Sequence, residues 1–106
     1  MNNIFNIVKK VYEKIKKQPY GTRCIVFIDD IIIPEDFLQT RPRKYKQMKS
    51  DNFYREHKYI DVPIEVCVAE NNGTHNKYLL LDGYTRYLTS KKFDVKYIPA
   101  RIVDMV

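Results

Sequence analysis

One short segment combines the residue types that bind phosphate. Asp82, Gly83, Tyr84, Thr85 and Arg86 follow a run of three leucines and precede a predicted helix. A strand that ends at a carboxylate, turns at a glycine and opens a helix brings together backbone N–H groups, the positive end of the helix dipole and a guanidinium. Glycine at the turn carries no Cβ that would keep a ligand away from the backbone. The segment therefore predicts a phosphate site; the alternative is an ordinary Asp-Gly turn whose Arg86 pairs with a nearby carboxylate.

A second segment, residues 40–49, carries the densest positive charge in the chain, with five basic residues and no acidic one. Arg41 lies in a loop before a weakly helical pattern rather than on the outer face of that helix. A run of this kind is commonly a solvated helix face, and that alternative stays open. The candidate nucleic-acid-binding residues are Arg43, Lys44, Lys46 and Lys49.

The remaining reactive side chains predict no metal site. Cys24 and Cys67 lie in separate apolar runs without C-x-x-C spacing, which indicates free thiols in a reducing compartment, with a disulfide between them as the lesser alternative. His57 and His75 fall in polar stretches, away from any ligand spacing. Adjacent aspartates in the 23–33 region would face opposite sides of a strand, so they would not act as a carboxylate pair.

Composition predicts one globular domain with an anionic partner. The chain has 106 residues, 44% hydrophobic and 13% aromatic, and a formal net charge of +6. This is enough apolar content for a core without disulfides or metal, and the positive charge suits nucleic acid or a nucleotide. The chain lacks both a signal-peptide pattern and an apolar stretch of transmembrane length. We therefore predict a soluble, cytoplasmic protein with no membrane partner.

The elements that must position these residues follow from hydrophobic periodicity and turn signals. An amphipathic helix over 3–18 is predicted to belong to an N-terminal unit, 1–22, packed on a domain formed by 23–106. In the predicted helix 44–56, Tyr45, Met48, Asn52 and Phe53 are assigned to the inward face. The order of elements predicts an α+β fold with a small mixed sheet and flanking helices. The other predicted elements are strands at 23–28, 31–33, 62–68, 78–81 and 100–103, a bend at 29–30, a helical turn at 34–37, a hairpin loop at 71–76 and a helix at 85–93.

Three sets of residues, taken in order, resemble motifs of the ParB/sulfiredoxin superfamily, in particular the small ParB-like nuclease domains. The resemblance covers about residues 23–103, and each motif is loose when taken alone. The motifs are Ile31-Ile32-Ile33-Pro34 followed by Thr40-Arg41-Pro42, then Pro63-Ile64-Glu65-Val66, and finally Leu81-Asp82-Gly83-Tyr84-Thr85-Arg86-Tyr87-Leu88 continuing to Ile98-Pro99-Ala100-Arg101-Ile102-Val103.

The resemblance implies a ParB/sulfiredoxin-like fold whose glycine–arginine turn binds phosphate. In ParB proteins this turn holds cytidine triphosphate, in sulfiredoxins an adenine nucleotide, and in a related serine kinase ADP. Carried over to this chain, Gly83, Thr85 and Arg86 form the phosphate cradle, and Arg41 reaches the same pocket from its loop. Asp82 would orient the turn, and Tyr84 would either block the pocket or stack on its ligand. Lys46 or Lys49 would add charge.

The departures from the family restrict the activity. Sulfiredoxin needs a cysteine inside the turn, where this chain has Tyr84, so sulfiredoxin activity is not expected. ParB proper has a helix-turn-helix domain and a dimerising tail beyond this domain, so partition activity by these 106 residues alone is not expected either. For the serine kinase activity, the candidate catalytic carboxylates are Glu35, Asp36 and Glu65.

Three functions stay open. The first is a stand-alone module that binds nucleic acid or a nucleotide at the turn; a nucleoside triphosphate with Mg²⁺ is the cofactor that the resemblance suggests, with none as the alternative. The second is a phosphodiesterase, nuclease or nucleotide-dependent phosphotransferase in the same pocket, although the sequence has no obvious cluster of metal-binding carboxylates. The third is an interaction domain that keeps the fold and has lost the ligand.

Overall fold

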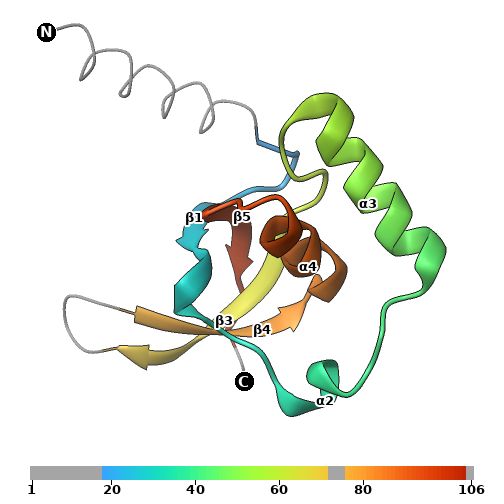
Figure 1. The fold of residues 1–106 in the computed structure, drawn as a ribbon. Coiled ribbons are helices and arrows are strands. Elements are labelled where there is room, and N and C mark those ends of the chain that lie inside the picture. The colour runs from blue at the N-terminus through green and yellow to red at the C-terminus, as the bar shows by residue number, and fades with distance from the viewer. Residues whose placement is uncertain (1–17, 72–75, 105–106) are drawn as a thin grey trace, which may run out of the picture.

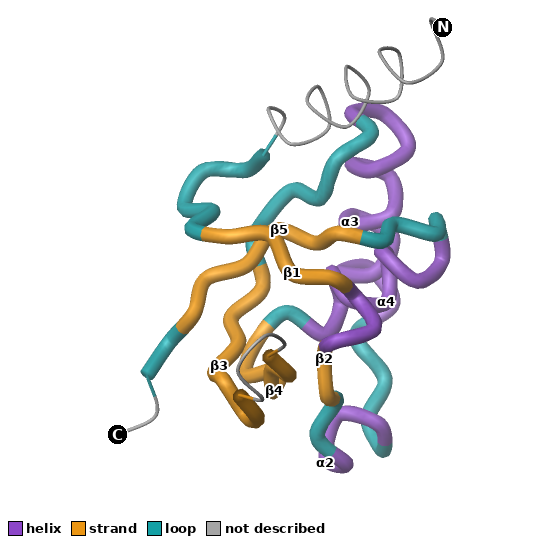
Figure 2. The backbone as a smooth tube through the Cα atoms, turned by 90° about the vertical axis from the view of Figure 1, so that its left-hand side faces the viewer, coloured by secondary structure: helices purple, strands orange, loops and turns teal. Residues whose placement is uncertain are grey.

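The computed structural model describes residues 18–71 and 76–104. Five strands form one mixed sheet in the order β1-β5-β3-β4-β2, and the helices lie to one side of it (Figures 1 and 2). The elements along the chain are β1 (Cys24–Phe27), the 3₁₀ helix η1 (Ile28–Asp30), β2 (Ile31–Ile32), α2 (Glu35–Leu38), α3 (Lys44–His57), β3 (Ile64–Asn71), β4 (Asn76–Asp82), α4 (Tyr84–Lys92) and β5 (Tyr97–Ile102).

The sheet is held together by two antiparallel and two parallel pairings. The hairpin strands β3 and β4 are antiparallel, as are β1 and β5. Strand β5 runs parallel to β3, and the short β2 runs parallel to β4 at the opposite edge. The chain therefore returns from α4 to insert β5 between two strands that precede it in sequence.

The core lies between the sheet and the helices. Ile64, Leu80 and Ile98, from three adjacent regions of the sheet, are completely buried, and Ile60 before β3 adds to the same cluster. Helix α4 packs beside β3, and α3 packs against α4 from the outside. This arrangement places the start of α4 over the middle of the sheet.

The structure confirms the α+β fold with a small mixed sheet and flanking helices. The predicted helices at 44–56 and 85–93 and the helical turn near residue 34 are present, and residues 29–30 lie in the 3₁₀ turn η1. Strand β5 begins before Pro99 rather than after it, because Tyr97 and Ile98 already pair with β1. The predicted helix at 3–18 and most of the predicted loop at 71–76 lie outside the described residues.

The predicted inward face of α3 is wrong. Tyr45, Met48 and Asn52 are exposed, and Phe53 is half-buried. The helix instead buries Ser50 and Asp51 against α4 through hydrogen bonds, and Tyr54 on the same side packs against the core and stacks on Phe93. Apolar periodicity cannot detect such an interface, because the pattern it searches for is absent.

The thiols are free and lie on separate strands. Cys67 is buried on β3 and Cys24 is half-buried on β1, with β5 between the two strands. The Cys24 thiol contacts the Ala100 carbonyl oxygen at 3.6 Å, and burial raises the pKa of this thiol.

Among the helices that can be described, none combines the length and the apolar character needed to cross a membrane.

Candidate functional site

The turn at Gly83 is fixed by backbone geometry and by close packing. Gly83 has φ +106° and is the N-cap residue of α4. A Cβ at this position would lie 2.7 Å from Cγ2 of Ile64 and 3.1 Å from its Cα. From the sequence, this glycine is expected to let a ligand approach the backbone, whereas the structure gives it a packing reason. In the described part of the chain no side chain caps α4, so its first N–H groups lack a capping acceptor.

Arg86, in the first turn of α4, is held by a carboxylate that the sequence analysis did not identify. Its Nε and Nη2 atoms donate to the two carboxylate oxygens of Asp61, each at 3.2 Å. The Arg86 and Asp61 side chains are 25% and 12% exposed, so this fork-like ion pair is well shielded. An ion pair between Arg86 and a nearby carboxylate is what the alternative interpretation of the sequence, an ordinary Asp-Gly turn, predicts. Because the pair uses only two of the three guanidinium nitrogens, Nη1 is left outside it.

Tyr84 packs against the protein in this structure. Its ring stacks on Phe37 of α2 with a centroid distance of 5.5 Å, and on Tyr87 at 6.2 Å. Phe37, Tyr84 and Tyr87 all lie against the apolar core. Tyr84 therefore anchors α2 over the start of α4.

The acidic residues considered for catalysis or for the turn lie at two separate positions in the structure. Glu65 and Asp82 are cross-strand partners on β3 and β4, immediately before the Gly83 turn. Glu35 and Asp36 are exposed in the first turn of α2. Within residues 18–71 and 76–104 there is no group of three or more histidine, cysteine or acidic side chains that could hold a metal ion.

A buried polar cluster joins α3 to α4 behind the turn. The Asp51 carboxylate accepts hydrogen bonds from Thr89 Oγ1 at 2.7 Å and Gln47 Nε2 at 3.0 Å, and pairs with the Lys92 ammonium. Because the Thr89 proton is committed to Asp51, the Ser50 hydroxyl donates to Thr89 Oγ1, at 2.8 Å. Burial raises the pKa of Asp51, but these hydrogen bonds and the charge of Lys92 outweigh burial and leave the pKa below its ordinary value.

Gln47 connects this cluster to the turn. Its amide nitrogen also lies 3.2 Å from the Thr85 carbonyl oxygen and 2.9 Å from Thr89 Oγ1. These three oxygens act as acceptors and share the two amide protons of Gln47, which fixes the orientation of the amide. The Gln47 carbonyl oxygen is buried and has no hydrogen-bond partner among the described residues. The first turn of α4 is thus fixed to α3 through the backbone of Thr85.

Arg41 lies beside the later turns of α4. It lines an open hollow of about 540 Å³ together with Lys91 and Lys92 at the end of α4. Pro42, Gln47 and Leu88 complete the lining. The predicted nucleic-acid-binding residues Arg43, Lys44, Lys46 and Lys49 are exposed at and after the start of α3.

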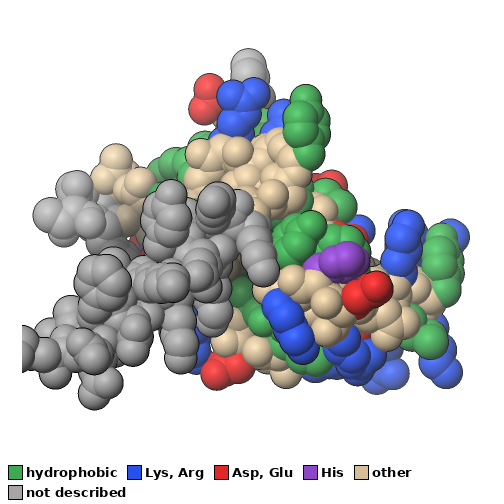
Figure 3. All heavy atoms as spheres, turned by 90° about the horizontal axis from the view of Figure 1, so that it is seen from above, with side chains coloured by type: hydrophobic (Ala, Val, Ile, Leu, Met, Phe, Trp, Pro, Cys, Tyr) green, Lys and Arg blue, Asp and Glu red, His purple; other side chains and the backbone are tan. Residues whose placement is uncertain are grey.

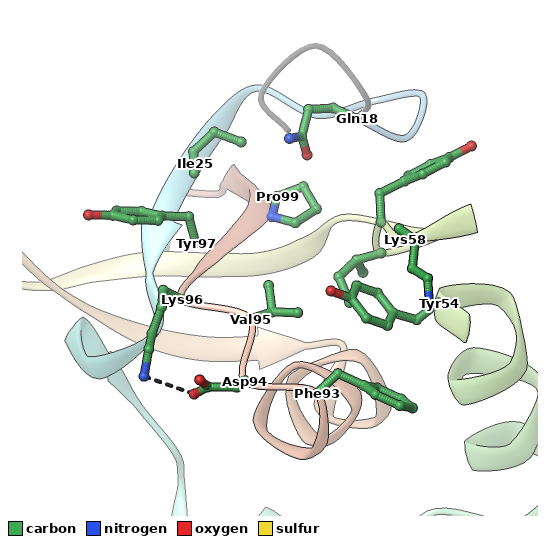
Figure 4. Close-up of a pocket in the computed structure, with 12 residues that line it drawn as sticks. Gln18, Ile25, Tyr54, Lys58, Phe93, Asp94, Val95, Lys96, Tyr97 and Pro99 are labelled. Atoms are coloured by element: carbon green, nitrogen blue, oxygen red, sulfur yellow. Dashed lines mark ion pairs between the residues drawn. The ribbon is translucent and has the colours of Figure 1, made fainter. Parts of the chain in front are cut away.

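A second hollow lies between the β1–β5 edge and the C-terminal ends of α3 and α4 (Figure 4). It has a volume of about 300 Å³. Its walls include Ile25, Pro99 and Tyr54, with Lys58 and Lys96 among the polar residues that line it. It is largely apolar and contains none of the residues of the Gly83 turn.

No family model matches the chain, and no curated protein matches it. Solved structures do. The chromosome-partitioning protein ParB from Caulobacter crescentus, complexed with CTP-gamma-S, aligns with a TM-score of 0.60 and 20% identity over 81% of this chain and 46% of that one. Sulfiredoxin from Arabidopsis thaliana aligns with a TM-score of 0.58 and 22% identity, over 78% and 88% of the two chains. The chain has a ParB/sulfiredoxin-like fold.

A free serine kinase in complex with AMP shares this fold, with a TM-score of 0.57 and 16% identity over 83% of this chain and 34% of the kinase. The chain therefore spans about half the length of the C-terminally truncated ParB and a third of the kinase chain. At these identities the comparisons establish the ParB/sulfiredoxin-like fold, and nucleotides are bound by more than one protein that has it. The free thiols of this chain lie on β1 and β3, whereas Tyr84 occupies the position after the turn glycine.

Proposed function

We propose that this domain binds a nucleotide, with the phosphates at the N-terminal end of α4. The observation that carries the proposal is the fork-like pair that holds Arg86 at this end of the helix while Nη1 stays outside the pair. Because the ion pair already restricts the Arg86 side chain, phosphate binding would cost little further side-chain entropy. Asp61 is therefore a positioning residue. The uncapped N–H groups of the first turn supply further donors.

Two further features support a phosphate ligand here. Gln47 bonds the Thr85 carbonyl oxygen and thereby fixes the first turn of α4 against α3. Solved proteins of the same fold are complexed with CTP-gamma-S, AMP or ADP. In this proposal Gly83, Thr85 and Arg86 surround the phosphates, and Asp82 and Tyr84 border them.

A thermal-shift panel of nucleoside mono-, di- and triphosphates, each with and without Mg²⁺, tests this function. A ligand present at a hundred times its Kd stabilises the native state by about 2.7 kcal/mol, which corresponds to a rise in Tm on the order of 10 °C for a domain of this size. At least one nucleotide is expected to raise the Tm, and inorganic phosphate at equal concentration is expected to raise it less. Mg²⁺ is a variable of the experiment because Glu65 and Asp82 lie next to the turn.

Variants of the ion pair separate a binding role of Arg86 from a structural one. Arg86→Ala alone leaves the Asp61 carboxylate shielded and unpaired, so the double variant Arg86→Ala/Asp61→Ala is the better test of binding. It is expected to abolish the nucleotide-induced shift. Asp61→Asn removes the charge and one acceptor of the fork-like pair, so it is expected to reduce the shift without abolishing it, because Arg86 stays present but is less well positioned.

Arg55→Ala is the matched control, because Arg55 is an exposed arginine near the end of α3 that bonds Asn52. It is expected to leave the shift unchanged. A shift of wild-type size in the double variant would remove the α4 turn as the binding site.

A further inference from the structure

Helix α3 presents large apolar side chains to solvent. Tyr45 and Met48 are 62% and 54% exposed, whereas the residues buried against α4 are Ser50 and Asp51. Residues three apart are neighbours on a helix surface, so Tyr45 and Met48 lie side by side. Lys49, four residues after Tyr45, lies on the same face. The exposed face of α3 thus carries a flat ring next to a cation.

Five cations around this ring have no carboxylate partner among the residues that the structure describes. Arg41, Arg43, Lys44, Lys46 and Lys49 form no ion pair with any residue that the structure describes. The cations elsewhere that do form pairs are Lys77 with Asp30, Arg86 with Asp61, Lys92 with Asp51 and Lys96 with Asp94.

The nearest following acid on α3, Asp51, is buried and bound to Lys92, so it does not offset this charge at the surface. Seen from above, Lys and Arg side chains gather around hydrophobic ones at the edge of the molecule where α3 lies (Figure 3). We call Arg41, Arg43, Lys44, Tyr45, Lys46, Met48 and Lys49 the α3 face.

The α3 face continues onto α4 through the open hollow. Arg41 and Lys91 both line this hollow, whose volume of about 540 Å³ is open to solvent. Lys91 also lies over the Tyr87 ring at 5.8 Å from its centroid. Positive charge therefore extends from the outer side of α3 across to the end of α4.

We propose that the α3 face binds single-stranded nucleic acid. Its unpaired cations would contact successive phosphates, and one unstacked base would stack on the Tyr45 ring, the combination used by proteins that bind single strands. In a duplex the bases are already stacked on one another, so the exposed ring would have nothing to stack on. This inference does not depend on the nucleotide site at α4.

The other partners of a basic, partly apolar helix fit less well. A helix that lies in a membrane interface buries one whole apolar face, but the α3 face has two large apolar residues, and the opposite side of the helix is committed to α4. An acidic protein would use the cations without needing a protruding, flat and largely exposed tyrosine.

Fluorescence anisotropy with a labelled single-stranded 12-nucleotide oligomer, and with the matching duplex, tests the proposal across a salt series. The wild-type domain is expected to bind the single strand more tightly. Tyr45→Ala is expected to weaken binding about tenfold without changing the salt dependence, and Tyr45→Phe to restore it, because a stacked base contributes through the ring. Lys46→Ala/Lys49→Ala is expected to reduce the slope of log K against log salt by about 1.4, which is about 0.7 for each lost phosphate contact.

Tyr20→Ala is the control, because Tyr20 is a fully exposed tyrosine outside α3. It is expected to bind like wild type. The nucleotide-site variant Arg86→Ala/Asp61→Ala is also expected to bind the oligomer with the wild-type Kd. A wrong proposal for the nucleotide site can therefore be told apart from a wrong proposal for the α3 face. Equal or tighter binding of the duplex, an unchanged Kd in Tyr45→Ala, or binding to anionic vesicles without binding to the oligomer would each overturn the proposal.

Discussion

Gly83→Ala is expected to lower the free energy of unfolding by about 2–5 kcal/mol. Two costs add: an L-residue in the left-handed region loses about 1–2 kcal/mol, and forcing a methyl group into a filled core loses about 1–3 kcal/mol. Both apply at φ +106° with Ile64 Cγ2 2.7 Å from the new Cβ. The Ile64 Cα at 3.1 Å belongs to a buried strand, so the neighbour cannot move away easily.

Gly21→Ala separates these two costs. Gly21 also has a positive φ, of +91°, but a Cβ there would meet Pro63 Cγ only at 3.8 Å. Only the backbone cost of about 1–2 kcal/mol is expected for this variant. Urea denaturation of both proteins, with m-values compared to wild type, gives the difference. Equal losses in the two variants would show that the contact with Ile64 has no energetic weight.

Asp51→Ala is expected to destabilise the domain by about 2–4 kcal/mol, because it leaves the buried Thr89 hydroxyl without its acceptor and removes the charged acceptor of the Gln47 amide, which keeps only the Thr85 carbonyl and Thr89 Oγ1. Lys92 is half-exposed and can return its ammonium group to water. Lys96→Ala, which breaks the exposed pair with Asp94, is the matched control and is expected to change stability little.

The same carboxylate predicts a pH dependence. Because the pKa of Asp51 is lower in the native state than in the unfolded chain, the unfolded chain binds its proton first as the pH falls. The stabilisation is therefore complete above the ordinary carboxyl pKa of about 4 and is lost as the pH drops through the native value. Asp51→Asn is expected to flatten the unfolding free energy between about pH 5 and pH 2 relative to wild type. An equally steep acid dependence in Asp51→Asn would assign it to other carboxylates.

The elements were predictable from sequence because local signals mark them. Pro34 starts α2, Gly83 separates β4 from α4, and short runs of apolar, largely β-branched residues mark β1 and β3. The sequence predicts helix α3 but not its orientation, since the inner face carries Gln47, Ser50 and Asp51 beside Tyr54. Polar residues on a helix normally indicate the solvent side, and only the positions of Thr89 and Lys92 on a second helix turn them inward.

The candidate site was predictable in its residues but not in its contacts. The turn and Arg86 follow from the sequence, whereas the partner of Arg86 is Asp61, 25 residues earlier in a loop. Nothing local distinguishes Asp61 from the other aspartates. The packing role of Gly83 likewise depends on Ile64 of a neighbouring strand. Contacts of this kind are set by how the sheet places its strands.

The position of β5 has a consequence for synthesis of the protein. Cys24 on β1 faces Ala100 on β5, and these paired residues are 76 apart in sequence. On the ribosome, residues 24–27 emerge long before the strand that they pair with. Until then β1 is an apolar segment with open hydrogen-bonding groups on both sides, a state that favours association with other chains. We expect the sheet to be completed only after residue 102 has emerged, because β5 is the strand that joins β1 to β3.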